Sequence, residues 1–289
     1  MAIWLPDWLQ GWLPRRWRRV NALPDRLWSS TLQAHPFLQA LTAPEKDTLR
    51  LLAAHFLQEK EFHGAHGLTI TDPMVVAIAA QACLPLLHIP GPDPSSNPAK
   101  AHRLDALDWY DDFVVIVVQP GTAVAQREVT DASGVVHRYR EALAGEAMQG
   151  GPVMLSWAEI QRAPAAADEG SNVVIHEFIH KMDMRGTRVG QAADGAPDWS
   201  HGCLGSLRGQ AARQHWLNTM TTAYEAFREA LSMAERFGGE RPWLDAYGAT
   251  HPGEFFAVTC EAYFVNRSRF GQEFPALLQL YDSFFKPGC

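Results

Sequence analysis

The feature that most constrains this chain is a pair of histidines four residues apart in an apolar segment. His176-Glu177-Phe178-Ile179-His180 directly follows Val173-Val174-Ile175. In a helix both imidazoles share one face and can reach one metal ion, with Glu177 beside the first of them. HExxH on a helix is typical of zinc hydrolases, whose glutamate accepts a proton from water at the metal. A solvated helix with two unrelated histidines is the alternative, and the apolar flanks argue against it because buried polar groups need partners.

A catalytic zinc site has three protein ligands and one open position, so a further ligand must come from elsewhere in the chain. Asp183 can bind the metal, although a role as hydrogen-bond acceptor for an imidazole suits it better. Glu254 and Glu261 are seven residues apart in an apolar segment and share a helical face. One can bind the metal while the other accepts a hydrogen bond from a ligand; exposure of one or both to solvent is the alternative. Tyr247 is a candidate for stabilising an oxyanion.

The remaining pattern predicts an α+β fold, mostly helical, with a small sheet. Helices are expected after the capping box Thr42–Glu45, from Asp72 to Leu87, and over about 172–184, 210–237, 252–266 and 275–286. Strands are expected at 113–118 and 153–157, with a hairpin of 126–130 and 135–140. The strand 153–157 is either an edge strand that pairs with extended substrate or an ordinary sheet strand. A loop is expected over 186–209.

The domain organisation predicted is a Trp/Arg-rich tail over residues 1–30 followed by a single domain over 31–289. The tail has tryptophans at positions 4, 8, 12 and 17 and a basic run at 15–19. Such a segment either lies on a membrane surface, or is a tail that docks its aromatic side chains on the body or is partly disordered. The second alternative is favoured, because internal prolines make a short segment a weak membrane anchor.

Charge and cysteine usage narrow the class of partner and the compartment. Lys and Arg total 25 against 32 Asp and Glu, a formal net charge of −7, so direct nucleic-acid binding is not expected. The four cysteines are far apart in the chain and form no CxxC pair. Without a signal peptide or a long apolar run, the expected location is the cytoplasm.

Two motifs carry a resemblance to known proteins. Tyr247-Gly248-Ala249-Thr250 followed by Glu254-Phe255-Phe256-Ala257 is similar to the end of the catalytic domain of anthrax lethal factor. More broadly, residues 35–286 resemble the Mlc titration factor A family of bacterial zinc metallopeptidases. The segments that match are 151–157, 172–177, 180–183, 245–247, 252–254 and 261–264.

The resemblance implies a zincin-like metallopeptidase fold and a zinc site. It implies that His176, His180 and Glu254 bind Zn²⁺, that Glu177 is the general base and that Tyr247 stabilises the transition state. It also implies aminopeptidase-like activity on peptides and binding of a transcriptional repressor of sugar uptake, of the Mlc type. The alternative is a regulatory protein that sequesters a transcription factor, with zinc structural or vestigial.

The sequence departs from the family pattern in two places. Position 251 is His, where a better helix cap such as Asp is expected, and the Trp-rich start is unlike the family. Neither departure affects the five site residues. A purely structural zinc site has no need of Glu177 or Tyr247, so the complete set favours the enzyme.

Overall fold

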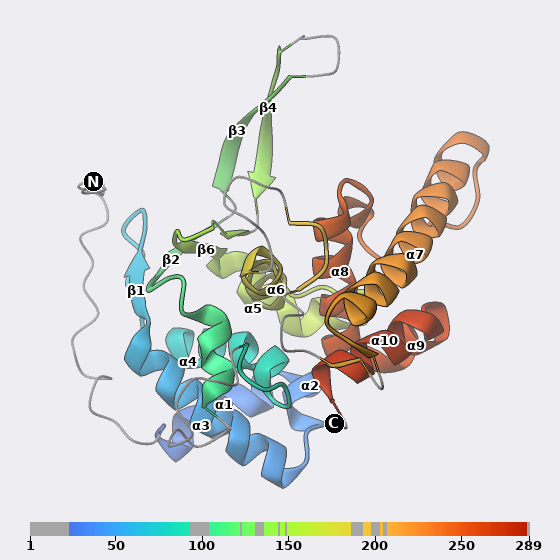
Figure 1. Cartoon of the computed structure of the whole chain (residues 1–289). Coiled ribbons are helices and arrows are strands. Elements are labelled where there is room, and N and C mark those ends of the chain that lie inside the picture. The colour runs from blue at the N-terminus through green and yellow to red at the C-terminus, as the bar shows by residue number, and fades with distance from the viewer. Residues whose placement is uncertain are drawn as a thin grey trace.

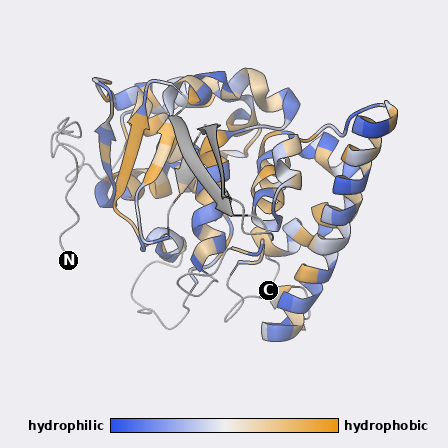
Figure 2. Ribbon diagram, turned by 90° about the horizontal axis from the view of Figure 1, so that it is seen from above, coloured by the Kyte–Doolittle hydropathy of each residue, from blue (hydrophilic) through white to orange (hydrophobic). Residues whose placement is uncertain are grey.

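A mixed four-stranded sheet with the order β1-β2-β6-β5 lies at the centre of the chain (Figure 1). The computed structural model of the protein describes residues 23–92, 104–121, 123–130, 136–143, 145–147, 149–185, 193–197, 203–204 and 207–287. The strands are β1 (Glu61–Gly64), β2 (Val115–Gln119), β6 (Val153–Ser156) and β5 (Gly145–Ala147). β1, β2 and β6 are parallel, and β5 is antiparallel to β6. The two central strands, β2 and β6, are hydrophobic and mostly buried, as a sheet packed in the core requires (Figure 2).

The N-terminal helices gather below the sheet in Figure 1. They are α1 (Asp25–Ala34), α2 (Pro36–Gln39), α3 (Ala43–Glu59) and α4 (Asp72–Cys83). The capping box predicted at Thr42 is confirmed, because Thr42 and Glu45 exchange side-chain and backbone hydrogen bonds at the start of α3. α4 is buried from Met74 to Cys83. The helix begins at Asp72, as expected, with Thr71 as its N-cap, and it ends at Cys83, where η3 follows.

The C-terminal half is helical, as expected. Its helices are α5 (Trp157–Ala166), α6 (Val173–Arg185), α7 (Gly209–Phe237), α8 (Pro252–Val265), α9 (Arg267–Glu273) and α10 (Pro275–Phe285). Along the whole of the described chain, short 3₁₀ helices occur at η3 (Leu84–Leu86), η4 (Asp105–Tyr110), η5 (Ala167–Glu169) and η6 (Ala246–Ala249). No helix in the described part of the chain is long and apolar enough to cross a membrane.

Aromatic side chains join the two halves into one core. Phe178, on α6, packs edge-on against Tyr110 at 4.9 Å between ring centroids and also contacts Phe56 and Phe113. On the other side of the core, Trp216 of α7 contacts α8 and α10. α6 is therefore wedged between the N-terminal helices and the C-terminal bundle, which fixes the position of any group on it.

The strand predicted at 153–157 is not an edge strand. β6 pairs with β2 on one side and with β5 on the other, so the edge strands of this sheet among the described residues are β1 and β5. The predicted hairpin is confirmed as β3 (Ala123–Thr130) and β4 (Val136–Leu143) in antiparallel register, projecting from the body in Figure 1; its turn at 131–134 lies outside the described residues. Within the expected loop 186–209, the described residues include two short strands, β7 (Cys203–Leu204) and β8 (Leu207–Arg208).

The predicted tail of residues 1–30 overlaps the body of the fold. Leu23 and Trp28 are buried in the core, and α1 begins at Asp25. The boundary of the packed body therefore falls at or before Leu23. The four tryptophans at positions 4, 8, 12 and 17 lie outside the described residues.

Gly170 offers a test of the packing that positions α6. It has φ +77° at the end of η5, and a Cβ there would come within 2.8 Å of the Trp243 ring. Gly150 has a similar φ of +64°, with open space where its Cβ would lie. We expect Gly170→Ala to lower the free energy of unfolding by about 3 kcal/mol through backbone strain plus a clash, and Gly150→Ala by about 1 kcal/mol through strain alone. Urea unfolding of both variants measures the difference, and equal losses would contradict the packing described here.

Candidate functional site

α6 presents both histidines of the HExxH motif toward α8. The helix begins after Asn172, whose side-chain oxygen accepts a hydrogen bond from the Ile175 amide at 3.0 Å. His176 Nε2 and His180 Nε2 are 3.0 Å apart. Glu254 Oε2 completes a triangle with them, at 3.2 Å from His176 and 3.1 Å from His180. The structure thus brings together the three residues predicted to bind a metal.

Glu254 owes its position to the start of α8. It lies in the first turn, after Pro252 and Gly253, where the helix dipole favours a negative charge. His251 is the N-cap, and its Nδ1 accepts a hydrogen bond from the Gly253 amide at 3.1 Å. An imidazole nitrogen therefore caps the helix by accepting a backbone hydrogen bond, which is the role expected of an aspartate at this position.

Glu261 lies two turns further along α8 and binds the far side of His176. Its Oε1 is 2.7 Å from His176 Nδ1. Its Oε2 accepts hydrogen bonds from the Asn172 amide and from Ser171 Oγ, the latter at 3.3 Å. The sequence leaves open which of the two glutamates lies with the histidine nitrogens and which accepts a hydrogen bond from a histidine. In the structure Glu254 lies beside both histidines, and Glu261 is the hydrogen-bond acceptor of His176.

The chemistry of these atoms fits a metal ion. With Nδ1 of His176 donating to Glu261, Nε2 is the ring nitrogen that faces the carboxylate oxygen of Glu254 and the nitrogen of His180, and its lone pair becomes available to a metal ion once its proton is lost. Three lone-pair donors that converge at 3.0–3.2 Å need a cation between them. The separations are close to the edge of about 3.3 Å of a tetrahedron with zinc–nitrogen and zinc–oxygen bonds of about 2.0 Å.

Glu177 lies beside this cluster without belonging to it. Its side chain is 3% exposed, and Oε2 has no hydrogen-bond partner among the described residues. Burial raises the pKa of this carboxyl to about 7, against the opposing charges of His176 and His180. A buried carboxylate next to a candidate metal site, with one oxygen that lacks a partner among the described residues, is suited to exchange protons near neutral pH.

Tyr247 lies on η6, on the other side of His176. The two rings are 6.3 Å apart between centroids. The Asp245 side chain caps η6 by accepting a hydrogen bond from the Tyr247 amide at 2.9 Å. The fold therefore places the predicted tyrosine near the histidines, partly exposed.

Asp183 is a structural residue rather than the predicted acceptor for an imidazole. It is fully buried, and its Oδ2 accepts a hydrogen bond from the Gly195 amide at 3.0 Å. It thereby ties the segment 193–197 to α6. Burial raises the pKa of this carboxyl to about 7. The acceptor role predicted for it belongs to Glu261.

An ion pair beyond the motif joins a buried lysine to a partly exposed aspartate, and the sequence patterns do not predict it. Lys181, which follows His180, is inaccessible to solvent and lies 2.5 Å from Asp112. Asp112 also accepts a hydrogen bond from the Gly150 amide at 3.2 Å, so the pair links α6 to the turn before β6. A charged residue directly after HExxH on a buried helix was the available signal, but its partner is distant in sequence.

A convergent His-His-Glu donor set beside a buried glutamate is the arrangement of a metal-dependent hydrolase. Comparison with known proteins agrees: the description "glucose-regulated metallo-peptidase M90" belongs to a family model that matches residues 9–286. The chain belongs to this family of metallopeptidases.

Curated relatives bear the name Mlc titration factor A. The protein of Salmonella arizonae is 32% identical over 273 residues, covering 94% of this chain and 95% of the relative. That of Enterobacter sp. strain 638 is 31% identical over 272 residues, with coverage of 93% and 90%. That of Klebsiella pneumoniae subsp. pneumoniae is 32% identical over 259 residues, with coverage of 90% and 85%. The resemblance found in the sequence is thus confirmed.

The role of Glu261 can be tested by metal affinity. In Glu261→Gln the amide nitrogen takes the place of one acceptor oxygen, so His176 Nδ1 and the Asn172 amide can no longer both be satisfied. We expect zinc affinity to fall by roughly 10–100-fold. Competition with a chromophoric chelator measures it, with Glu229→Gln on the exposed side of α7 as the charge-matched control. Equal affinity in both variants would show that Glu261 does not orient the imidazole.

Asp183 makes stability depend on pH in a defined direction. The unfolded carboxyl titrates near 4 and the folded one near 7. Between these values the folded protein holds a proton that the unfolded chain has lost, so this contribution to stability falls as pH rises. We expect Asp183→Asn to remove it. Relative to wild type, the free energy of unfolding of the variant should rise by about 2 kcal/mol from pH 5 to pH 7.

Urea unfolding at both pH values in the presence of EDTA measures that difference without a contribution from metal binding. A difference between variant and wild type that stays constant with pH would contradict the raised pKa.

Proposed function

We propose that this protein is a zinc-dependent peptidase of the cytoplasm, aminopeptidase-like in its action, with a zincin-like fold. One observation carries the proposal: the His176, His180 and Glu254 donor atoms form a triangle of 3.0–3.2 Å beside the buried carboxylate of Glu177. His176, His180 and Glu254 would hold the zinc. A structural site closes around its metal with four protein ligands, whereas three leave one position for substrate or water.

The proposed reaction divides between the metal and the side chains around it. Bound at this site, zinc supplies a Lewis acid that polarises the peptide carbonyl and lowers the pKa of water. Glu177 accepts a proton from the attacking water and later donates it to the departing amine. The Tyr247 hydroxyl donates a hydrogen bond to the developing oxyanion. Glu261 keeps His176 in one tautomer, with its Nε2 lone pair directed into the site.

A peptide substrate would lie along the sheet edge next to α6. Of the two edge strands, β1 and β5, it is β5 that contacts α6. An extended backbone can add to such an edge as a further strand. Pairing with an extended substrate, which the sequence suggests for the strand 153–157, is therefore proposed for β5 (Gly145–Ala147) instead.

A partner of the Mlc type is the second part of the proposal. The relatives are named Mlc titration factor A, and this name supports an Mlc-related partner for this chain, which we propose to be a transcriptional repressor of sugar uptake. In the alternative, the chain sequesters such a repressor and its zinc is structural or vestigial. The buried, unpartnered Glu177 favours the enzyme, because a closed structural site gains nothing from it.

Substitution of Glu177 separates catalysis from metal binding. Glu177→Gln keeps the shape of the side chain and removes its ability to accept a proton. We expect zinc content of about one per chain in both proteins and a loss of roughly 10²–10⁴-fold in hydrolysis of aminoacyl anilides. Metal analysis and initial rates, measured side by side, test both expectations. Full activity in the variant would refute the proposed general base, and bound zinc with no activity in either protein would favour the regulatory alternative.

A further inference from the structure

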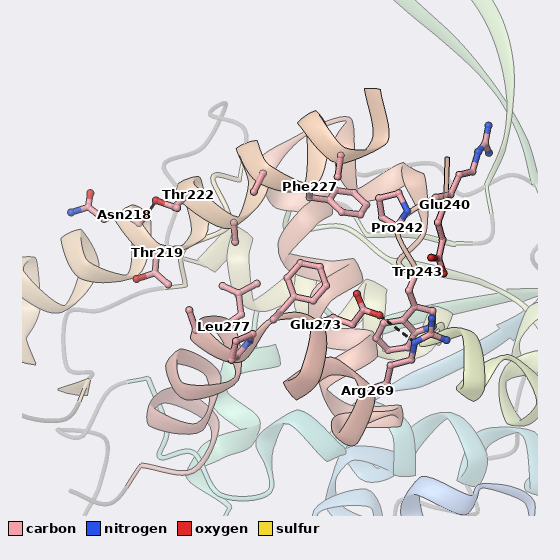
Figure 3. A pocket seen from close by; sticks show the side chains of 17 residues that line it. Asn218, Thr219, Thr222, Phe227, Glu240, Pro242, Trp243, Arg269, Glu273 and Leu277 are labelled. Carbon is pink, nitrogen blue, oxygen red and sulfur yellow. Dashed lines mark hydrogen bonds and ion pairs between the residues drawn. The ribbon is translucent and has the colours of Figure 1, made fainter. Parts of the chain in front are cut away.

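A cavity of about 820 Å³ lies between α7, the segment Glu240–Trp243 and the start of α10. Figure 3 shows Phe227, Leu277 and Trp243 around it, with Asn218 and Thr219 at one end and Trp243 with Arg269 at the other. We name it the α7 pocket. Its floor is apolar, and its volume lies in the range of ligand-binding sites.

The apolar lining continues beyond the pocket along α7. Ala226 and Ala230 line the pocket, and Met233 and Phe237 follow them at helical spacing on the same face. Met233 is 52% exposed and Phe237 74% exposed, the highest values among the large apolar side chains of the described residues. A contiguous exposed apolar surface of this kind marks an interaction site.

The length of this surface distinguishes the kind of ligand. From Thr219 to Phe237 the helix rises by about 27 Å. A small molecule fills the pocket but leaves the outer stripe exposed, whereas about eight residues of extended polypeptide cover the whole length. The charges beside the pocket have both signs: Glu240 and Arg241 on the returning segment, and the pair Arg269–Glu273 at 3.6 Å. This mixture suits a polypeptide better than an anionic membrane or a nucleic acid.

Trp243 connects the α7 pocket with the surroundings of the proposed active site. Its ring lines the α7 pocket and also a second cavity of about 380 Å³. That second cavity is bounded by Val173, one turn before His176 on the same face of α6, and by Asp245, which caps the turn that carries Tyr247. The indole nitrogen donates to the Asp168 carbonyl at 3.1 Å, so this wall is held in place.

We propose that the α7 pocket is a docking site for a polypeptide that is also engaged at the His-His-Glu site. An apolar segment of that polypeptide lies along α7, and the chain continues past Trp243 toward the second cavity. The inference rests on the proposed function in one respect: it treats the docked polypeptide as the peptidase substrate.

The test blocks the pocket without changing the core. Ala230 is exposed, and arginine has nearly the helix propensity of alanine, so Ala230→Arg fills the pocket and leaves the fold intact. Ala211→Arg is the matched control, because Ala211 is exposed on the same helix and outside the pocket. Both are made in the full chain, and thermal unfolding confirms equal stability.

Binding is measured by fluorescence anisotropy with fluorescein-labelled, reduced and carboxymethylated α-lactalbumin, an unfolded acidic polypeptide. The proteins carry Glu177→Gln, so the probe remains uncut. We expect Ala230→Arg to weaken binding at least tenfold and Ala211→Arg to leave it unchanged. The added positive charge attracts this probe in both variants, so a loss in one reports the blocked pocket.

Turnover is measured in proteins that retain Glu177. We expect Ala230→Arg to lower kcat/KM at least tenfold for the unlabelled polypeptide and to leave hydrolysis of an aminoacyl anilide unchanged. If Ala230→Arg removes binding of the probe but the protein hydrolyses neither substrate, the docking proposal is supported and the peptidase proposal fails. The docking proposal would be overturned if the two arginine variants had equal effects or if no variant bound the probe. It would also be overturned if Ala230→Arg weakened binding to phosphatidylglycerol vesicles and left binding to the polypeptide probe unchanged.

Discussion

The contact between α6 and α8 is the interaction on which the site depends. Glu261, 5% exposed, holds His176 through Nδ1 and the start of α6 through Ser171 and the Asn172 amide. The same helix carries Glu254 in its first turn. A carboxylate buried this deeply is tolerated only when its oxygens are satisfied. The hydrogen bonds that make its burial possible therefore also set the distance between the two helices and place the metal-binding atoms.

The electrostatics of the cluster favour a positive charge among its members. Glu177, Glu254 and Glu261 surround two imidazoles, and hydrogen bonds from both histidines outweigh burial and hold the pKa of Glu254 well below its usual range. Burial also opposes the charged form of His176, but Glu261 and Glu254 raise its pKa well above the ordinary value. The protein thus stabilises cations at this point. A divalent metal meets that demand while leaving the nitrogen lone pairs in use as ligands.

Local sequence patterns predict the helices that carry the site. They predict only in part how these helices and the strands lie against one another. The HExxH spacing is a property of one helix and was sufficient to place His176 and His180 on one face. Two glutamates seven apart could not be assigned from periodicity, because their roles depend on how α8 lies against α6. The order of strands is equally non-local, so the sequence alone does not decide whether β6 is an edge strand or an inner strand. α5 was missed because Pro164 lies inside it, and α9 because it is short and polar.

The extent of α7 is difficult to explain by packing alone. Its last buried residue is Phe227, yet the helix continues to Phe237 and only then turns back through Gly238 and Gly239, both at positive φ. Helical residues without tertiary contacts gain little stability, and large apolar side chains in water add none. The turn, however, returns the chain so that Trp243 lies against the pocket and η6 places Tyr247 beside His176. The helix that extends the apolar surface and the segment that bears the proposed oxyanion donor are thus consecutive in the chain, so a polypeptide held along α7 is also directed toward the proposed site of cleavage.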